Sequence, residues 1–444
     1  MDQSMKSEAA PQEAVAPGEL NQGCLCITLD RDALRRAFEE ETGDPDFCGA
    51  LLRTRPHLYA NVAVFVSADT ISQMLSVVRI IEAVSALPAY REAALAWAPT
   101  AVRFDPGPIG AFMGYDFHVT GDGPKLIEIN TNAGGAFLTA PLARAQKRCC
   151  EAAAKARSPA NADGFDAAAL RMFEAEWHRQ GRAGKPGRVA IVDDDPEAQF
   201  LYPEFILAQR FFAKHGIEAV VADGKDLAYE RGVLTCEGLP IDLVYNRLVD
   251  FSLDHPNHAA LRAAYLDGAV VVTPNPRAHA LFADKRNLTL LSDRGWLERA
   301  GVTPSGIATL KACIPETHQV TAANASAFWA ERKRFFFKPA GGHGSKAAYR
   351  GSKLTKSVWA DIVSGTHVAQ AFAAPGARTV RVDASHETLK ADLRLYTYAG
   401  EILLVAARLY QGQTTNMRTP GGGFAPVFQI KGGAEPAPAI ARVR

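Results

Sequence analysis

Residues 111–135 read AFMGYDFHVTGDGPKLIEINTNAGG, two runs of alternating polar and apolar character on either side of a Gly-Asp-Gly stretch. Glycine readily adopts the positive φ that tight hairpin turns require, so we predict a β-hairpin that turns at 121–123. If the pairing is symmetrical about the middle of this turn, Asp116 lies opposite Glu128. Side chains alternate along a strand, so Asn130 lies on the same face as both carboxylates.

Two directly opposed carboxylates are an unusual feature of a hairpin. Their Cβ atoms lie about 5 Å apart in a strand pair, and like charges at that distance repel unless a cation lies between them. Carboxylate and amide oxygens suit Mg²⁺, which usually takes one or two protein carboxylates together with phosphate and water. One interpretation is therefore half of a Mg²⁺–nucleotide site formed by Asp116, Glu128 and Asn130. The alternative is a hairpin whose acids face water, and a phosphate-binding half elsewhere in the chain would decide between the two.

Composition excludes several classes of protein. The 444-residue chain carries 49 Lys and Arg against 48 Asp and Glu, so no excess of basic charge indicates a nucleic-acid partner. No apolar run is long enough to span a bilayer, and the acidic, Pro/Ala-rich start does not resemble a secretory signal. Seven cysteines without a disulfide framework or zinc spacing indicate reduced thiols. We therefore expect a cytoplasmic protein without a membrane partner, and these features carry no prediction of oligomeric state.

The chain length favours two or three domains. The segment before the hairpin is mostly helical, whereas strands and helices alternate from Arg188 onward, which predicts a small parallel sheet of the Rossmann type. The expected organisation is a disordered tail over 1–22, an N-terminal segment with the hairpin over 23–155, a Rossmann-like domain over 186–276, a lobe with a glycine-rich loop over 277–375, further strands over 376–432 and a disordered tail over 433–444.

A glycine-rich loop is a candidate for the phosphate-binding half. Lys338 ends an aromatic strand and is followed by PAGGHGS, where Gly341, Gly342 and Gly344 let backbone N–H groups approach phosphates closely. The order of residues is not that of a Walker A motif, and a plain glycine-rich turn is the alternative. Lys285 lies at the start of a predicted helix in FADKRNLTLLSD, where a solvated lysine is the alternative.

A second hairpin, over 391–410, is predicted to turn at Ala399-Gly400. Asp392 and Arg394 lie two residues apart on its otherwise apolar first strand, so a buried ion pair or an arginine that faces an anion competes with a solvated face. A two-residue turn directs Arg408 to the opposite face from Arg394, and only a bulge would bring the two arginines together.

The order of these motifs resembles that of the ATP-grasp superfamily. Lys285 in a DK context is followed by KPAGGHG at 338–344, the strand VAQAF, DLR at 392–394 and NMR at 416–418. The stretch YDFHVTGDGPKLIEINTNAGG is similar to the closing, Mg²⁺-binding hairpin of that family, yet here it comes first. The chain therefore resembles a circularly permuted ATP-grasp protein of the glutathionylspermidine synthase type, with an inserted Rossmann-like domain. This resemblance requires residues 116–130 to lie beside residues 392–408.

The resemblance implies an α/β fold in which 23–155 carries the metal-binding part of the core, 277–375 the nucleotide-binding lobe and 376–432 the C-terminal lobe. It also implies an ATP-dependent ligase that joins a small-molecule carboxylate to an amine through an acyl phosphate, with ATP and Mg²⁺. The residues implied are Asp116, Glu128 and Asn130 for the metal; Arg394 and Lys338 for catalysis; Lys285, Lys338, Gly341, Gly342, Gly344, Gln370 and Asn416 for ATP; and Arg247 and Arg418 for substrate.

Two of these assignments have their own basis in the sequence. Arg247 ends the strand VYNRL, and ligands of open α/β sheets collect at strand ends. Gln370 occupies a position where many relatives have a glutamate near the adenine, so the adenine contacts depart from the family pattern. Competing functions are an ATP-grasp-type small-molecule kinase and a non-catalytic ATP-binding protein. A dinucleotide-binding Rossmann protein is disfavoured, because no G-x-G-x-x-G follows the strand RVAIVDDD.

Overall fold

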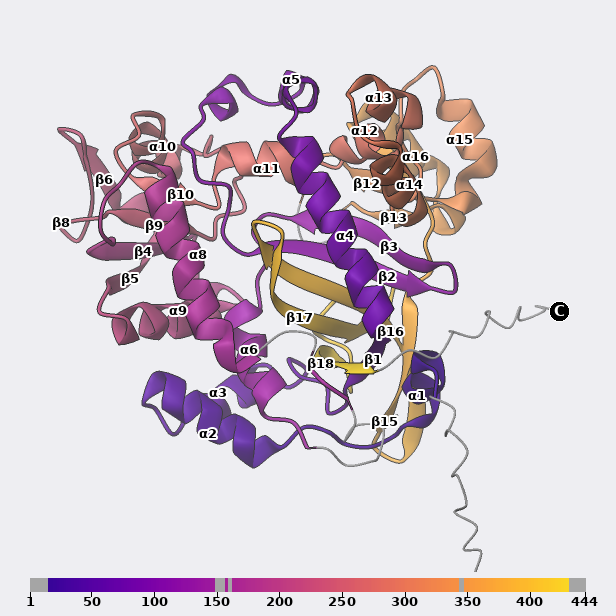
Figure 1. Ribbon diagram of the computed structural model, residues 1–444, viewed down its shortest axis with the longest axis horizontal. Coiled ribbons are helices and arrows are strands. Elements are labelled where there is room, and N and C mark those ends of the chain that lie inside the picture. Colours follow the sequence, from indigo (N-terminus) through magenta and orange to yellow (C-terminus); the bar gives the residue numbers. More distant parts are fainter. Residues whose placement is uncertain (1–14, 148–155, 159–161, 343–346, 431–444) are drawn as a thin grey trace, which may run out of the picture.

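The early hairpin is part of a sheet that also contains the last strands of the chain (Figure 1). The computed structural model describes residues 15–147, 156–158, 162–342 and 347–430. The spatial order of the seven-stranded central sheet is β1 (Val64–Ser67), β18 (Gly423–Ile430), β17 (Glu401–Tyr410), β16 (Ser385–Tyr398), β2 (Met113–Thr120) and β3 (Gly123–Asn130), with β15 (Gly376–Val382) also paired to β16. β1 and β18 are parallel, and the other neighbours are antiparallel.

Strand pairing confirms that the two hairpins are neighbours. β2 pairs with β16 in a register that places Asp116 beside Arg394, and β2 pairs with β3 so that Asp116 lies opposite Glu128, as predicted. Near the turn the register differs by one residue from the symmetrical expectation, because Thr120 pairs with Gly123. A bulge at Ile127 restores the predicted pairing further along the strands.

The predicted orientation of Arg408 is wrong. The register of β16 and β17 shifts between Tyr396 and Thr397, so Leu403 has no partner and Arg408 lies opposite Asp392. Because β17 has one extra residue here, the side chains beyond it point to the opposite face from the one expected. Arg408 therefore lies on the face that carries Asp116 and Arg394.

The two faces of the central sheet differ in chemistry. Helix α4 (Ala68–Ser85), whose N-terminus is capped by the Ser67 side chain, crosses one face (Figure 1). Its apolar residues pack against odd-numbered strand residues such as Tyr115 and Leu393. The even-numbered residues of the same strands, Asp116 and Arg394 among them, point the other way. α5 (Pro88–Ala96) and α14 (Pro304–Cys313) complete this side.

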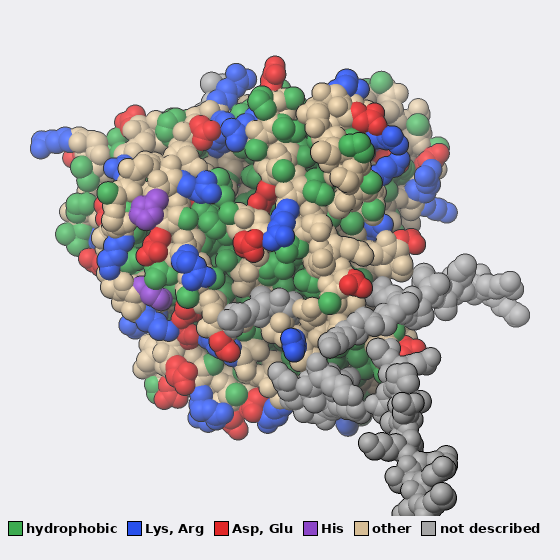
Figure 2. Space-filling model, in the orientation of Figure 1, with side chains coloured by type: hydrophobic (Ala, Val, Ile, Leu, Met, Phe, Trp, Pro, Cys, Tyr) green, Lys and Arg blue, Asp and Glu red, His purple; other side chains and the backbone are tan. Residues whose placement is uncertain are grey.

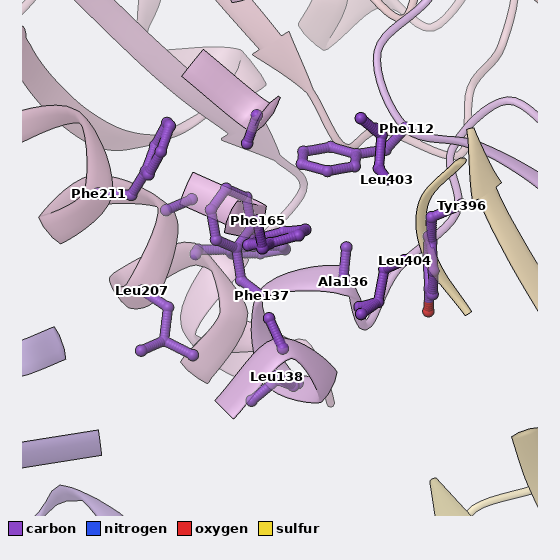
Figure 3. Packing of buried hydrophobic residues seen from close by; sticks show 14 of the residues in the cluster. Phe112, Ala136, Phe137, Leu138, Phe165, Leu207, Phe211, Tyr396, Leu403 and Leu404 are labelled. Atoms are coloured by element: carbon purple, nitrogen blue, oxygen red, sulfur yellow. The ribbon is translucent and has the colours of Figure 1, made fainter. Parts of the chain in front are cut away.

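Aromatic side chains join the central sheet to the Rossmann-like segment. Phe112, Phe137 and Phe165 lie together with Phe211 and Tyr396 in one buried cluster (Figure 3). The helices that contribute are α2 (Arg31–Thr42), α3 (Phe47–Thr54), α6 (Ala136–Arg144), α8 (Phe165–Arg179) and α9 (Tyr202–Lys214).

Two smaller layers flank the central sheet (Figure 1). One is a parallel sheet, as expected for the Rossmann-like segment, in the order β10 (Val271–Thr273), β9 (Leu243–Asn246), β4 (Arg188–Asp193) and β5 (Glu218–Asp223), accompanied by β6 (Leu227–Glu230), β7 (Val233–Cys236), β8 (Leu239–Pro240) and α10 (Ala259–Leu266). The other is an antiparallel sheet of β11 (Thr317–Gln319), β14 (His367–Ala371), β12 (Phe335–Pro339) and β13 (Tyr349–Arg350), with α11 (Pro276–Phe282), α12 (Asn287–Ser292), α13 (Arg294–Arg299), α15 (Ala325–Glu331) and α16 (Lys356–Ser364).

The structure corrects part of the expected N-terminal tail. Pro17–Gly23 form helix α1, and the Asn21 side chain exchanges two hydrogen bonds with the backbone of Phe65 on β1. Residues 1–14 and the expected tail at 433–444 lie outside the described residues. Among the described residues, no single helix is long and apolar enough to cross a membrane. Lys and Arg side chains are interspersed with Asp and Glu over the face in Figure 2, as the balanced composition predicts.

Candidate active site

A cavity of about 550 Å³ lies between the charged face of the central sheet and the antiparallel β11–β14–β12–β13 sheet. Strands β2, β3, β16 and β17 supply one wall, and β12, β14 and the segments after β14 and β17 contribute to the others. Its volume lies in the range typical of small-molecule and cofactor sites. The predicted site residues on its wall are Asp116, Glu128, Asn130, Lys285, Lys338, Gly342, Gln370, Arg394 and Asn416.

Two arginines neutralise Asp116. Arg394 donates to both carboxylate oxygens, from Nε at 2.6 Å and Nη2 at 2.7 Å, and Arg408 Nη2 lies 2.8 Å from Oδ2. Burial by itself would raise the pKa of Asp116, but the two guanidinium groups lower it to about 2. Arg408 also donates from Nε to Asp392 at 2.6 Å, and this second carboxylate accepts a hydrogen bond from the Thr415 hydroxyl.

Two lysines accompany Glu128. Lys285 Nζ lies 3.1 Å from Glu128 Oε1 and 3.2 Å from the Gly342 carbonyl oxygen, to which it donates. Burial opposes ionisation of Glu128, yet Lys285 and Lys338 lower the pKa of this carboxyl below its usual value. The chain therefore supplies its own cations to both opposed carboxylates, so their repulsion does not by itself require a bound metal.

Lys338 is held where the β3 bulge exposes a carbonyl group. The bulged Ile127 accepts a hydrogen bond from Lys338 Nζ at 2.6 Å, and the Gln370 Oε1 atom accepts another at 2.9 Å. Burial, together with the charge of Lys285, lowers the pKa of Lys338 to about 8. The amide nitrogen of Gln370 is buried without a hydrogen-bond partner among the described residues. An acceptor on a ligand in the cavity would satisfy it.

Three predicted residues lie away from the cavity wall. Arg247 is buried beside Glu204, with 3.9 Å between Nη2 and Oε2, and a Cβ atom added to Gly134 would lie 3.0 Å from Nη2. It therefore lies behind the loop at Gly134, which itself lines the cavity. Gly341 and Arg418 are exposed and are not among the described lining residues. Gly344 falls in 343–346, outside the described residues.

Several lining residues were not predicted. His118 lies two residues after Asp116, and its Nδ1 donates to the Ala373 carbonyl at 2.8 Å; strand alternation could have found it. Arg350 lies over the Phe372 ring at 4.3 Å, and Lys390 and Thr415 also line the cavity. No local pattern distinguishes these three side chains from ordinary surface residues.

A smaller hollow of about 130 Å³ adjoins the cavity and shares Glu128, Asn130, Lys285 and Gly342 with it. The His279 ring stacks on Phe251 at 3.6 Å between centroids, and its Nδ1 lies 3.0 Å from the Thr131 hydroxyl. Burial and the charge of Lys285 lower the pKa of His279 to about 3, so this imidazole is neutral at pH 7.

No family model matches the sequence, and no curated protein matches it. Among solved structures, a glutathione synthetase-like effector from Globodera pallida superposes with a TM-score of 0.55 at 12% identity, covering 92% of this chain and 100% of that one. The chain has an ATP-grasp-type fold. At this identity the similarity concerns the fold alone.

Two further solved structures are similar to this chain, with TM-scores below 0.5. A putative gamma-glutamylcysteine synthetase from Methylobacillus flagellatus gives a TM-score of 0.45 at 10% identity, over 82% of this chain and 89% of that one. The ATP-grasp ligase PsnB in complex with a minimal precursor gives 0.30 at 13% identity, over 54% of this chain and 89% of that one.

Proposed function

We propose that this protein is an ATP-dependent ligase that joins a carboxylate to an amine through an acyl phosphate, with Mg²⁺-bound ATP. One observation carries the proposal. Carboxylates from an early hairpin and cations from segments far along the chain line one cavity of about 550 Å³ within an ATP-grasp-type fold. The proposed role of each residue follows from its charge and its contacts in this cavity.

The side chains on the cavity wall fit a nucleotide. Lys285 and Lys338 would neutralise phosphate oxygens, with Gly342 beside them on the wall. The unpartnered amide nitrogen of Gln370 would donate to the adenine base. Asn416, on the segment that follows β17, would close the phosphate end of the site.

The donor set also fits a magnesium ion, with one change from the sequence-based expectation. Glu128 and Asn130 offer a carboxylate and an amide oxygen, which matches the usual requirement of Mg²⁺ for few protein ligands and several phosphate or water oxygens. Asp116 is already bound by Arg394 and Arg408, so its proposed role is mainly to hold these two arginines. Bound Mg²⁺ would supply charge neutralisation between the phosphates.

The chemistry requires positioning and charge neutralisation more than covalent help from the protein. A substrate carboxylate oxygen attacks the γ-phosphorus, the phosphoanhydride bond breaks and ADP leaves, which gives the acyl phosphate. The amine then attacks the acyl carbon, the C–O bond to phosphate breaks, and the nitrogen loses a proton. Arg394 is suited to the charge that develops, because Asp116 fixes its Nε and Nη2 while Nη1 makes only a 3.4 Å contact to the Gly134 carbonyl.

The adjoining hollow is the proposed site of the amine. It shares its wall with Glu128 and Lys285, so an amine there would lie beside the phosphate end of the main cavity. A volume of about 130 Å³ holds only a few non-hydrogen atoms, which favours a small amine or the amine end of a longer molecule. The neutral His279 imidazole and the Thr131 hydroxyl provide hydrogen-bond partners for that group.

Measuring ADP release with pooled amino acids and polyamines as acceptors, followed by mass spectrometry of the products, tests the proposal. We expect ADP and a new amide in the wild-type protein. In Glu128→Gln, ADP release should fall about 100-fold or more, because one proposed metal ligand loses its charge. The control is Glu230→Gln on exposed β6, which should retain full activity.

Three other outcomes of these assays would change the proposed function or the role of Glu128. A phosphorylated product without an amide would identify a kinase instead. Nucleotide binding without ADP formation across the substrate screen would indicate a non-catalytic ATP-binding protein. Unchanged turnover in Glu128→Gln would refute the assignment of this residue.

A further inference from the structure

Phe200 is an exposed aromatic side chain on the wall of the main cavity. Its exposed fraction is 43%, and it is the one large, exposed hydrophobic side chain in the described residues that lines this cavity. Arg55 holds it from outside: Nη2 donates to the Gln199 carbonyl at 3.3 Å, and Nε donates to the Phe200 carbonyl. The Arg55 guanidinium also lies 5.5 Å from the centre of the Phe200 ring. An aromatic ring that is fixed at a cavity wall and left uncovered is available to an apolar ligand.

Further apolar side chains lie close to Phe200 around the loop at Gly134. A Cβ atom added at Gly134 would collide with Leu201 Cδ1, and one added at Gly135 would collide with the ring of Phe424. Both of these apolar side chains also line the cavity. The apolar part of the wall at this loop is called the apolar end, and its members are Phe200, Leu201, Met417 and Phe424.

Strand β2 separates the apolar end from the segment that follows β14. His118 donates to the Ala373 carbonyl of that segment at 2.8 Å. Tyr396, the partner of Gly114 across the strand pair, donates to the Gly134 carbonyl at 2.8 Å. Gly114 and His118 are four residues apart, which is roughly 13 Å along a strand. A nucleotide whose base lies at β14 therefore leaves the apolar end free for a second molecule.

Arg394 provides an anion-binding group beside the apolar end. Asp116 holds its Nε and Nη2, whereas Nη1 makes only a 3.4 Å contact to the Gly134 carbonyl. A carboxylate that accepts a hydrogen bond from Nη1 would lie next to the Gly134 loop. The remainder of such a molecule would then extend toward Leu201 and Phe200, which lie at the same loop.

The cavity wall offers no free carboxylate to a substrate ammonium group. Asp116 and Glu128 are the acidic side chains among the described lining residues, and arginine or lysine side chains already bind both. The α-ammonium group of an amino acid would lose hydration here without gaining an anionic partner. The apolar end is therefore better suited to an acid without an ammonium group.

We infer that the carboxylate substrate is an apolar acid without an ammonium group, whose aromatic or branched aliphatic body binds at the apolar end while Arg394 binds its carboxylate. This inference rests on the proposed ligase function and names the class of acid that the ligase uses. The acid is activated as proposed above: one carboxylate oxygen takes the γ-phosphoryl group of ATP, and ADP leaves.

Three acids that differ by one group each test this inference in wild-type protein. The acids are 3-phenylpropionate, propionate, which lacks the ring, and phenylalanine, which adds an ammonium group. With Mg²⁺, ATP and hydroxylamine as the amine, ADP release and hydroxamate formation report the reaction. We expect kcat/KM for 3-phenylpropionate to exceed that for each of the other two acids by about tenfold or more. Equal or higher values for propionate or phenylalanine would overturn the inference.

A substitution at Phe200 tests where the apolar body binds. Phe200→Ala should raise the KM for 3-phenylpropionate about fivefold or more and leave the KM for propionate unchanged, because only the larger acid reaches this ring. The matched control is Leu239→Ala on β8, whose side chain is similarly exposed at 49% and lies outside the described cavity wall. It should change neither KM. An equal effect of Phe200→Ala on both acids would refute binding at the apolar end.

Binding measurements separate this inference from the proposed function. Calorimetric titration of 3-phenylpropionate and propionate uses wild-type protein with Mg²⁺ and a non-hydrolysable ATP analogue. Preferential binding of 3-phenylpropionate without any hydroxamate would support the apolar end and refute the ligase function. Hydroxamate from other acids, with neither binding nor reaction of 3-phenylpropionate, would support the function and refute the inference. Absence of both binding and reaction for every acid would refute both.

Discussion

Asp116→Asn is the substitution that most directly separates a structural role from a metal-binding role. The carboxylate is buried between Arg394 and Arg408, with three contacts of 2.6 to 2.8 Å. If its main task is to neutralise these arginines, the variant should be strongly destabilised even without nucleotide. If its main task were to bind metal against the repulsion of Glu128, loss of its charge would leave stability unchanged or improved.

The expected loss of stability can be worked out from the pKa of the Asp116 carboxyl group. A pKa of about 2 in the folded state, against an ordinary value near 3.9, corresponds to about 2.5 kcal/mol of stability at neutral pH. Removing one partner from a buried ion pair typically costs about 3–5 kcal/mol, because the remaining charge stays buried. Asp392 still pairs with Arg408, so Arg394 is the arginine left without a carboxylate. We expect Asp116→Asn to lower the free energy of unfolding by about 3–5 kcal/mol.

Urea unfolding followed by far-UV circular dichroism measures this effect. The matched control is Asp122→Asn at the exposed tip of the same hairpin, which should change stability by less than about 0.5 kcal/mol. The folded-state pKa of Asp116 is lowered, so its contribution is present above pH 4 and lost as pH falls toward 2. The difference between wild type and variant should therefore be constant from pH 5 to 8 and shrink below pH 4. A variant as stable as wild type at pH 7 would refute the structural role.

Three other outcomes can be measured. Because the pKa of Lys338 is about 8, the nucleotide dissociation constant should weaken about tenfold between pH 7 and pH 9 by calorimetry, whereas Lys338→Arg should abolish this dependence. His258 lies between two aspartates, which raise its pKa against the effect of burial. The protonated imidazole therefore stabilises the folded protein fully below pH 6.5, and this contribution is lost as the pH rises through the folded-state pKa. In thermal melts, His258→Gln should destabilise the protein by about 2 kcal/mol at pH 5.5 and by less at pH 8.5. A Cβ atom at Gly351 would lie 1.7 Å from the Arg332 carbonyl oxygen, so Gly351→Ala should cost about 3 kcal/mol in urea unfolding, whereas Gly18→Ala, with nothing within 4 Å, should not.

Local sequence patterns predicted those parts of the site that are determined by one strand or one turn. Strand alternation and the turn position predicted that Asp116 lies opposite Glu128. The structure confirms the pair, because the bulge at Ile127 compensates for a register that differs by one residue near the turn. The neighbouring second hairpin was predicted by resemblance to a family, because no local rule pairs segments so far apart. Arg408 shows the limit, since one unpaired residue, Leu403, reverses the direction of every side chain beyond it.

Tertiary contacts determine the features that local sequence patterns did not predict. Arg247 directly follows β9, close to the expected strand end, but it lies beside Glu204 on α9, behind Gly134 instead of at the cavity surface. Helix α1 has only seven residues and weak periodicity, so its stability comes from Asn21 and the sheet it contacts.

The pairing of β2 with β16 also constrains how the polypeptide is made. Asp116 and its partner Arg394 are 278 positions apart, so a ribosome that adds 5–20 residues per second needs roughly 15 to 55 seconds to bridge them. During that interval the early hairpin has an unpaired edge and a carboxylate whose arginines have not yet been translated. The edge of β2 therefore lacks its partner β16 until synthesis is nearly finished, and α4, which precedes the hairpin in the chain, covers one face of the hairpin and not that edge.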